Sequence, residues 1–230
     1  FKLLLSSVGV EKLVFWSLVL ARFSVAMIGN FGLTGGIVKY VAKHLALDDR
    51  ERVSLVVQTA VISVSVLTGV ALMASYPIIK WILAKIIPSD VLSLALAILL
   101  NALIALWLML LTGIFQGGLD GCQRIDIRNI ILLAASLFNL ILCCILAPKY
   151  QLMGLSYAKI LGNFATLLAS WLALRKLLPE LPLIPKRWRS DVFKEIIGYG
   201  ASFQLMSLIA MLFDPITKGL LSKFGSLSIV

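Results

Sequence analysis

Long apolar blocks separated by short polar segments form the main pattern of this chain. The apolar residues do not alternate with polar ones at every second position, as the strands of an outer-membrane barrel would require. A membrane-spanning helix needs about 20 mostly apolar residues. Six blocks meet that length: Leu13–Phe31, Val53–Tyr76, Val91–Phe115, Asn129–Ala147, Leu152–Leu174 and Ile196–Leu221. The pattern predicts an all-α, multi-pass helical membrane protein.

Prolines and the chain ends add detail to this prediction. Pro77 is expected to end the second block, and Pro148 to mark an outer hairpin between the fourth and fifth blocks. Phe1–Val10 resembles the tail of one more span, and the chain begins without Met and stops at Val230. We therefore expect it to be a piece of a longer protein.

Composition agrees with a membrane location. Hydrophobic residues make up 60% of the chain, charged residues only 14%, and the mean hydropathy is +1.02. A soluble domain has about 25% charged residues. Cys122, Cys143 and Cys144 suggest no disulfide framework and are interpreted as packing residues.

Basic residues are distributed unevenly among the loops, and this predicts the orientation. Twelve occur after the first, third and fifth spans: Lys39, Lys43, Arg50, Arg52, Arg124, Arg128, Arg175, Lys176, Lys186, Arg187, Arg189 and Lys194. The intervening loops carry three: Lys80, Lys85 and Lys149. By the positive-inside rule, loops 32–52, 116–128 and 175–195 face the cytoplasm. Topology and attraction to anionic lipids thus explain most of the net charge of +10, and no nucleic-acid partner is expected.

Two glycine-rich stretches lie in predicted cytoplasmic segments. Gly29, Gly32, Gly35 and Gly36 do not form the G-x-G-x-x-G nucleotide fingerprint, and we interpret them as a helix break with close packing. A short amphipathic helix over Ile37–Leu47 should follow, with His44 at the membrane surface. Because His44 has no second ligand nearby, no metal site is expected.

The second stretch, Gln116–Asn129, predicts a short turn. It contains Asp120, Arg124, Asp126 and Arg128, which we interpret as a local salt-linked cap.

A proline-rich segment divides the chain. Pro179, Pro182 and Pro185 recur at every third residue, which favours a stiff extended linker, and Lys186–Lys194 suits a basic interfacial helix. We therefore predict an N-terminal helical lobe over 1–175, a cytoplasmic linker over 176–195, and the first helix of a second lobe over 196–230.

The last apolar block, Ile196–Leu221, is the one block that contains both an acid and a base. Helical spacing places six residues on one face: Gly200, Gln204, Ser207, Met211, Asp214 and Lys218. Asp214 and Lys218 are four residues apart and can pair, and Pro215 between them should kink the helix. A lone charge at the bilayer centre costs about 2.5–3.5 kcal/mol, so this face should meet protein or a watery cavity.

Two further cations lie inside predicted spans. Arg22 either faces a cavity or forms a buried structural pair, and Lys159 either snorkels to the interface or faces the cavity. Asn101 is a candidate for a hydrogen bond between helices. The chain contains no P-loop, H-E-x-x-H or G-x-S-x-G motif, so we predict no enzyme, no catalytic residue and no cofactor.

Several segments resemble one family of membrane proteins. They are SSVGVEKLVFWSLVL, NFGLTGGIVKYVAKHLAL, GIFQGGLDGCQRIDIRN and GYGASFQLMSLIAMLFDPITKGLLSKFGSLSIV. The chain is similar to polysaccharide-biosynthesis proteins, the O-antigen-type flippases of the MOP (MATE-like) superfamily. The resemblance implies twelve to fourteen helices in two lobes around a central cavity. It also implies that this chain holds the end of helix 1, helices 2 to 6, and helix 7.

That family moves lipid-linked oligosaccharides across the cytoplasmic membrane. The implied partners are a polyprenyl-diphosphate-linked glycan, membrane lipids and glycan polymerase or assembly proteins. A cavity containing Arg22, Lys159 and Lys218 would suit a diphosphate, with Asp214, Gln204 and Ser207 beside them and coupling to H+ or Na+. The alternatives are a MATE-type cation-coupled drug or small-molecule antiporter, a non-transporting membrane scaffold, or an integral-membrane glycosyltransferase.

Overall fold

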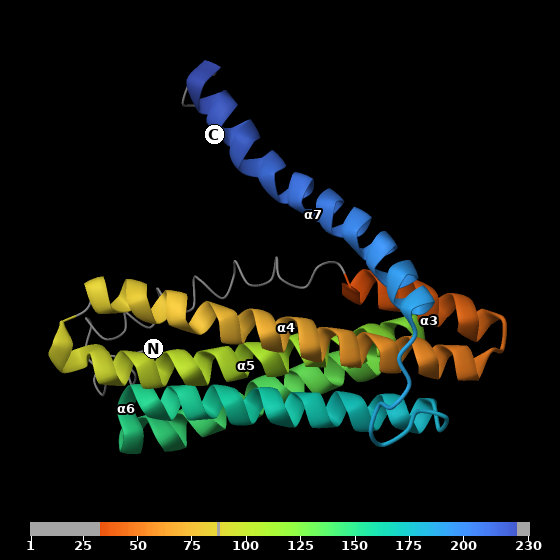
Figure 1. Cartoon of the computed structure of the whole chain (residues 1–230), viewed down its shortest axis with the longest axis horizontal. Coiled ribbons are helices and arrows are strands. Elements are labelled where there is room, and N and C mark those ends of the chain that lie inside the picture. Colours follow the sequence, from red (N-terminus) through yellow and green to blue (C-terminus); the bar gives the residue numbers. More distant parts are fainter. Residues whose placement is uncertain (1–32, 87, 225–230) are drawn as a thin grey trace.

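The computed structural model describes residues 33–86 and 88–224, and the regular elements in that range are all α-helices (Figure 1). In chain order they are α3 (Leu33–Ala46), α4 (Arg50–Ile86), α5 (Ser89–Gly121), α6 (Ile125–Leu177) and α7 (Ser190–Phe224). Helices α4, α5 and α6 lie side by side, with α3 at one end of the bundle. Helix α7 starts beside α3 and runs obliquely away from the other helices.

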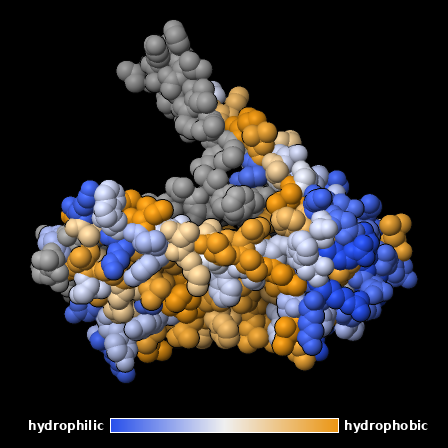
Figure 2. Space-filling view, viewed as in Figure 1, coloured by the Kyte–Doolittle hydropathy of each residue, from blue (hydrophilic) through white to orange (hydrophobic). Residues whose placement is uncertain are grey.

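Three described helices are long and apolar enough to cross a membrane. They are Arg50–Ile86, Val91–Gly121 within α5, and Ile125–Leu177. At 37 residues, α4 is about 55 Å long, which exceeds the ~30 Å hydrocarbon core of a bilayer. Figure 2 shows apolar surface across the middle of the bundle, and hydrophilic surface concentrated at the end where α3 lies. The predicted all-α membrane fold is confirmed for the described residues.

Helix α6 contains the predicted hairpin. Its backbone leaves helical geometry at Gln151, where φ is 51° and ψ is −127°, three residues after Pro148. The two arms then run antiparallel, since Asn139 on the first arm donates a hydrogen bond to the carbonyl of Ala158 on the second at 3.3 Å. The blocks Asn129–Ala147 and Leu152–Leu174 are therefore the two arms, as predicted.

Two predicted helix ends are wrong. Helix α4 continues through Pro77 to Ile86, because one missing N–H can be tolerated in a long membrane helix. Helix α5 continues through most of the expected 116–128 turn and ends at Gly121, so only residues 122–124 are non-helical. The predicted salt-linked cap is present: Arg124 pairs with Asp126 at 3.0 Å, and Arg128 pairs with Asp120.

Glycines in α3 and α5 allow the helices to approach closely. A Cβ at Gly36 would lie 2.6 Å from the carbonyl oxygen of Ile196 in α7, and a Cβ at Gly121 would lie 2.7 Å from the Cβ of Val41. Neither position has room for a larger residue. The predicted close packing is therefore confirmed at Gly36, but Gly35 and Gly36 lie inside α3 and do not break it. Gly29, Gly32 and the predicted span Leu13–Phe31 lie outside the described residues.

Helix α3 belongs to the core of the bundle. Ile37 and Val41 are fully buried, and they pack in one cluster with Val57 of α4, Ile114 of α5 and Ile196 of α7. The amphipathic helix predicted over Ile37–Leu47 is confirmed as part of α3, with Lys39 and Lys43 exposed and the apolar face covered by α4, α5 and α7. The end of the bundle with the most basic loops is the tightly packed end.

Replacing Gly36 by alanine should lower the melting temperature of the purified protein in detergent. The added methyl would meet the backbone of Ile196 and force a shift that costs about 1–3 kcal/mol. Gly198→Ala is the matched control, because a Cβ at Gly198 meets nothing within 4 Å. There, alanine should stabilise the helix by up to about 1 kcal/mol. Equal melting temperatures for the two variants would contradict the close packing.

Candidate functional site

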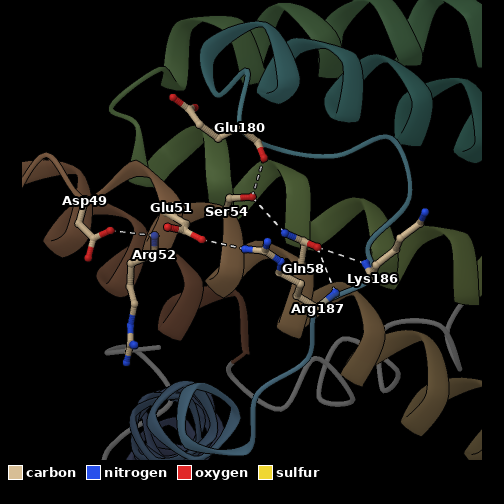
Figure 3. A network of polar contacts seen from close by, with 8 residues as sticks. All are labelled: Asp49, Glu51, Arg52, Ser54, Gln58, Glu180, Lys186 and Arg187. Atoms are coloured by element: carbon tan, nitrogen blue, oxygen red, sulfur yellow. Dashed lines mark hydrogen bonds and ion pairs between the residues drawn. The ribbon is translucent and has the colours of Figure 1, made fainter.

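Residues 178–189, which we call the linker, connect α6 to α7 and lie against α4 (Figure 3). The amide of Gln58 lies at the centre of the contact. Its oxygen accepts the backbone N–H groups of Lys186 at 3.1 Å and Arg187 at 3.2 Å. Its nitrogen donates to the hydroxyl of Ser54 at 3.1 Å, and that hydroxyl donates to the carbonyl of Glu180 at 3.0 Å. Two buried polar side chains of α4 therefore bind the linker backbone at both of its ends.

Further contacts extend this attachment on both sides. The indole N–H of Trp188 donates to the hydroxyl of Ser63 at 2.9 Å. At the exposed edge, Arg187 pairs with Glu51 at 2.8 Å. Because both side chains of that pair are largely exposed to solvent, it contributes about 0–1 kcal/mol. The buried amide and hydroxyl contacts dominate the attachment.

The prolines predict a stiff extended linker, and residues 178–189 are indeed non-helical, but they also pack on the bundle. Leu178 and Leu181 are buried in the same core cluster as α3 and α4. The basic helix predicted over Lys186–Lys194 is correct only from Ser190 onward, where it forms the first turns of α7. Lys186 and Arg187 stay non-helical because their N–H groups are bound to the fixed amide of Gln58.

The start of α7 is held against the first bundle, whereas several described side chains of its later part are exposed. Val192 and Ile196 are buried, and Arg52 of α4 lies 3.6 Å from the carboxylate of Asp191. The ammonium of Lys39 lies 3.9 Å from the ring centroid of Tyr199, a cation–π contact between α3 and α7. Beyond that point four large apolar side chains are at least 60% exposed: Leu205, Met206, Ile209 and Phe213.

The residues predicted to line a cavity are only partly described. Arg22 lies outside the described residues, and the side chains of Asp214 and Lys218 do too, although both positions belong to α7. Pro215 also lies within α7, which is one helix from Ser190 to Phe224. Gln204 is half-buried and Ser207 is exposed on the same helix.

Lys159 is half-buried on the second arm of α6, which packs mainly on α5, whereas α7 packs on α3 and α4. The described part of the chain does not bring Lys159 together with the α7 residues. The grouping of these six residues stays a prediction. Asn101, the predicted interhelical donor, has no partner for its buried amide nitrogen among the described residues. Asn163 of α6 instead donates to the carbonyl of Ala105 in α5 at 2.6 Å.

His44 is buried, contrary to the predicted surface position. It is 9% exposed, and neither ring nitrogen has a hydrogen-bond partner among the described residues. Burial holds the pKa of His44 below its ordinary value, and the nearby charges of Lys43 and Arg52 lower it further, against smaller opposing effects of Asp49 and Glu195. In the described part of the chain, no three His, Cys, Asp or Glu residues group closely enough to hold a metal ion.

Sequence reasoning missed His44 and the role of Gln58 for the same reason. Both are polar residues in apolar surroundings, which is a visible signal in the sequence. The partner of Gln58, however, is the backbone of residues more than 120 positions later, and no local pattern indicates it.

Solved structures share this fold, whereas no protein-family model and no curated protein matches the chain. One is the outward-facing conformation of a multidrug resistance MATE family transporter of the MOP superfamily, with a TM-score of 0.73 and 20% identity. That match covers 92% of this chain and 49% of the transporter. The inward-facing conformation of a MATE family transporter gives a TM-score of 0.63 at 19% identity, over 82% of this chain and 46% of the other.

A MOP superfamily transporter from Pyrococcus furiosus, described as having a binding pocket of reversed polarity that suggests a different function, gives a TM-score of 0.69. It is 19% identical over 92% of this chain and 49% of its own. The chain thus spans about half the length of these transporters. The predicted all-α, multi-pass helical fold is confirmed, and it resembles about half of a MATE family transporter.

Removing the amide of Gln58 should release the linker. In Gln58→Ala, the N–H groups of Lys186 and Arg187 lose their acceptor, which costs about 1–3 kcal/mol. Trypsin should then cleave after these two residues about tenfold faster, measured by mass spectrometry of timed digests. Glu51→Gln is the control, because the exposed pair with Arg187 contributes little. Cleavage in Gln58→Ala at the unmodified rate would show that the amide does not hold the linker.

The buried His44 should make the protein less stable in mild acid. The pKa of His44 is lowered in the folded state. The stability that the neutral His44 contributes is therefore complete when the pH is above the ordinary histidine pKa of about 6.5. It is lost as the pH falls toward the lowered pKa. The melting temperature should therefore fall between about pH 7 and pH 5.5. His44→Leu should remove part of that fall, and since His44 is the one histidine of the sequence, no other imidazole contributes. Identical pH profiles would contradict this assignment.

Proposed function

We propose that this chain forms one lobe of a membrane transporter that works by alternating access. The observation that carries the proposal is the match of nearly the whole chain to about half of a MATE family transporter, with a TM-score of 0.73. The exposed apolar part of α7 fits the same view, because a helix that leaves its own bundle needs other helices or lipid around it. We infer that α7 is the first helix of a second lobe.

The arrangement of α7 supports an outward-open state. Helix α7 contacts the first bundle at the end that carries the most basic loops, which the positive-inside rule places on the cytoplasmic side, and diverges from it in the other direction (Figure 1). The likeness is also greater to the outward-facing than to the inward-facing transporter. In this proposal, an inward-open state requires separating α7 from α3 at Gly36 and Lys39.

For the cargo we propose a lipid-linked oligosaccharide with an anionic diphosphate. Transfer of that charge through hydrocarbon is prohibitive without compensating cations, and the cations in the spans are Arg22, Lys159 and Lys218, against Asp214. The Pyrococcus furiosus transporter, whose pocket polarity is described as reversed, supports the view that charge rather than fold discriminates cargo. Asp214 would position Lys218 or couple transport to H+ or Na+, with Gln204 and Ser207 on the same helical face.

This function implies a location and a set of partners. The protein would lie in the cytoplasmic membrane with loops 32–52, 116–128 and 175–195 on the cytoplasmic side. The glycan carrier would be a polyprenyl diphosphate whose tail stays among the helices, and glycan polymerase or assembly proteins would receive the product. The protein would act as a transporter and not as an enzyme.

A second candidate is a MATE-type cation-coupled drug or small-molecule antiporter. The likeness to multidrug resistance transporters favours it, at a TM-score of 0.73 for the outward-facing structure. The two candidates require opposite charges in the cavity. An organic cation needs an acid such as Asp214, whereas a diphosphate needs the bases.

Transport by the full-length protein in liposomes distinguishes the two. With a polyprenyl-diphosphate oligosaccharide labelled on its sugar, Arg22→Gln, Lys159→Gln and Lys218→Gln should each slow translocation about tenfold or more, since each removes one charge-assisted contact. Lys176→Gln, at an exposed position in the last turn of α6, is the matched control and should leave the rate unchanged.

Normal translocation by all three variants would overturn the proposed anionic cargo. Proton-driven uptake of an organic cation that is abolished by Asp214→Asn, with no movement of the glycan lipid, would establish the antiporter instead. No transport of either class would overturn the proposed transporter.

A further inference from the structure

An apolar groove lies between α4 and α5, on the half of these helices that points away from the α3 end. It encloses about 430 Å³. Six of the residues that line it are Gly69, Met73, Tyr76, Leu100, Ile104 and Trp107. Its lining is almost entirely carbon, so any occupant must be apolar.

The floor of the groove is fixed. The indole N–H of Trp107 donates to the carbonyl of Ser65 at 3.2 Å, which holds the ring against α4. Gly69 lies beside it without a side chain, and a Cβ there would still be 3.7 Å from the indole nitrogen. The hollow therefore exists because position 69 is glycine and the ring of Trp107 cannot swing across it.

Beyond the groove, the helix faces that line it continue to polar residues. On α4, Lys80 lies one helical turn beyond Tyr76 and two beyond Met73, so it continues the face that lines the groove. On the antiparallel α5, Ser93 lies two turns before Leu100 and likewise continues the lining face. Because Trp107 lies level with Ser65 and Gly69, Ser93 comes close to the level of Lys80. Lys80 and Ser93 are both exposed.

The depth of the groove corresponds to one leaflet of a bilayer. Gly69 and Lys80 are separated by about 16 Å along α4 at ~1.5 Å per residue, roughly half of the ~30 Å hydrocarbon core. A chain whose headgroup lies at Lys80 would thus reach the floor at Trp107. The charge distribution places this end of α4 on the outer side of the membrane.

We propose that this groove binds an acyl chain of an anionic phospholipid of the outer leaflet, with the lipid phosphate at Lys80 and Ser93. Among the described side chains Lys80 forms no ion pair. An apolar protein segment would fill the hollow but add no negative charge at this end of α4 and α5, where Lys80 and Lys85 outnumber Asp90. A phospholipid supplies both an apolar chain and a phosphate. The groove contains none of the residues predicted for the transport cavity, and the proposal does not depend on the identity of the cargo.

Photo-cross-linking of the full-length protein in phosphatidylcholine nanodiscs tests the site without any cargo. The nanodiscs contain a trace of phosphatidylglycerol with a diazirine in its tail, or the phosphatidylcholine counterpart, and the labelled residues are mapped by peptide mass spectrometry. We expect the anionic lipid to label Met73, Leu100 or Ile104 about fivefold more than the zwitterionic one, the effect of one lysine near a phosphate.

Two pairs of variants test the charge at Lys80 and the space at Gly69 independently. Lys80→Gln should abolish the preference for the anionic lipid, whereas Lys85→Gln, on the other side of α4, should leave it. Gly69→Leu should fill the groove and remove the labelling by both lipids. Gly198→Leu, a matched change where a Cβ meets nothing within 4 Å, should not remove it.

Three results would overturn the proposal. The first is equal labelling by the two lipids in the unmodified protein. The second is a preference that persists in Lys80→Gln, which tests the charge at an exposed position and does not disturb packing. The third is that neither diazirine lipid labels the groove residues, as expected if the N-terminal part of the chain or a second copy fills the groove.

Discussion

The close contact between α3 and α7 is the constraint on which the rest of this structure depends. Gly36 brings the backbones of the two helices together at Ile196, and any side chain there would separate them. Helix α3 is in turn held against α5 at Gly121, where a Cβ would meet Val41. The start of α7 is therefore tied to the first bundle through one short, closely packed helix.

The linker reinforces this attachment by a different kind of interaction. Inside an apolar helix, a polar side chain is costly unless it is hydrogen-bonded. Gln58 and Ser54 satisfy that requirement with the backbone of the linker, which lacks regular hydrogen bonds of its own. The same bonds therefore serve the helix and the linker, and they fix where α7 begins. An extended proline-rich segment becomes part of the core.

Tight packing at one end of the bundle contrasts with open packing at the other. The main buried cluster gathers α3, the first half of α4, the end of α5 and the start of α7. Toward the other end, Met73 and Trp81 of α4 are 80% and 61% exposed, and the apolar groove separates α4 from α5. Alternating access requires the two lobes to move relative to each other, and a tightly packed end would let the first lobe move as one body. The open end leaves room for lipid between the helices.

Much of the fold could be predicted from the sequence, because long apolar runs and a strongly biased charge distribution are local properties. They identify the spans at Val53, Val91 and the hairpin around Pro148, and they predict which loops face the cytoplasm. The helix ends could not be predicted. Pro77 and Gly118 favour termination in isolation, but α4 continues through Pro77, and α5 needs the small size of Gly118 against Leu174 within a continuous helix.

The candidate site, like the fold, has features that the sequence predicts and features that it does not. The sequence by itself determined that Gln204, Ser207, Asp214 and Lys218 share one face of a helix, because that follows from helical periodicity alone. Only the tertiary structure decided that His44 is buried and that the linker is docked on α4. Both depend on contacts between residues far apart in the chain, and such contacts are set by how whole helices pack.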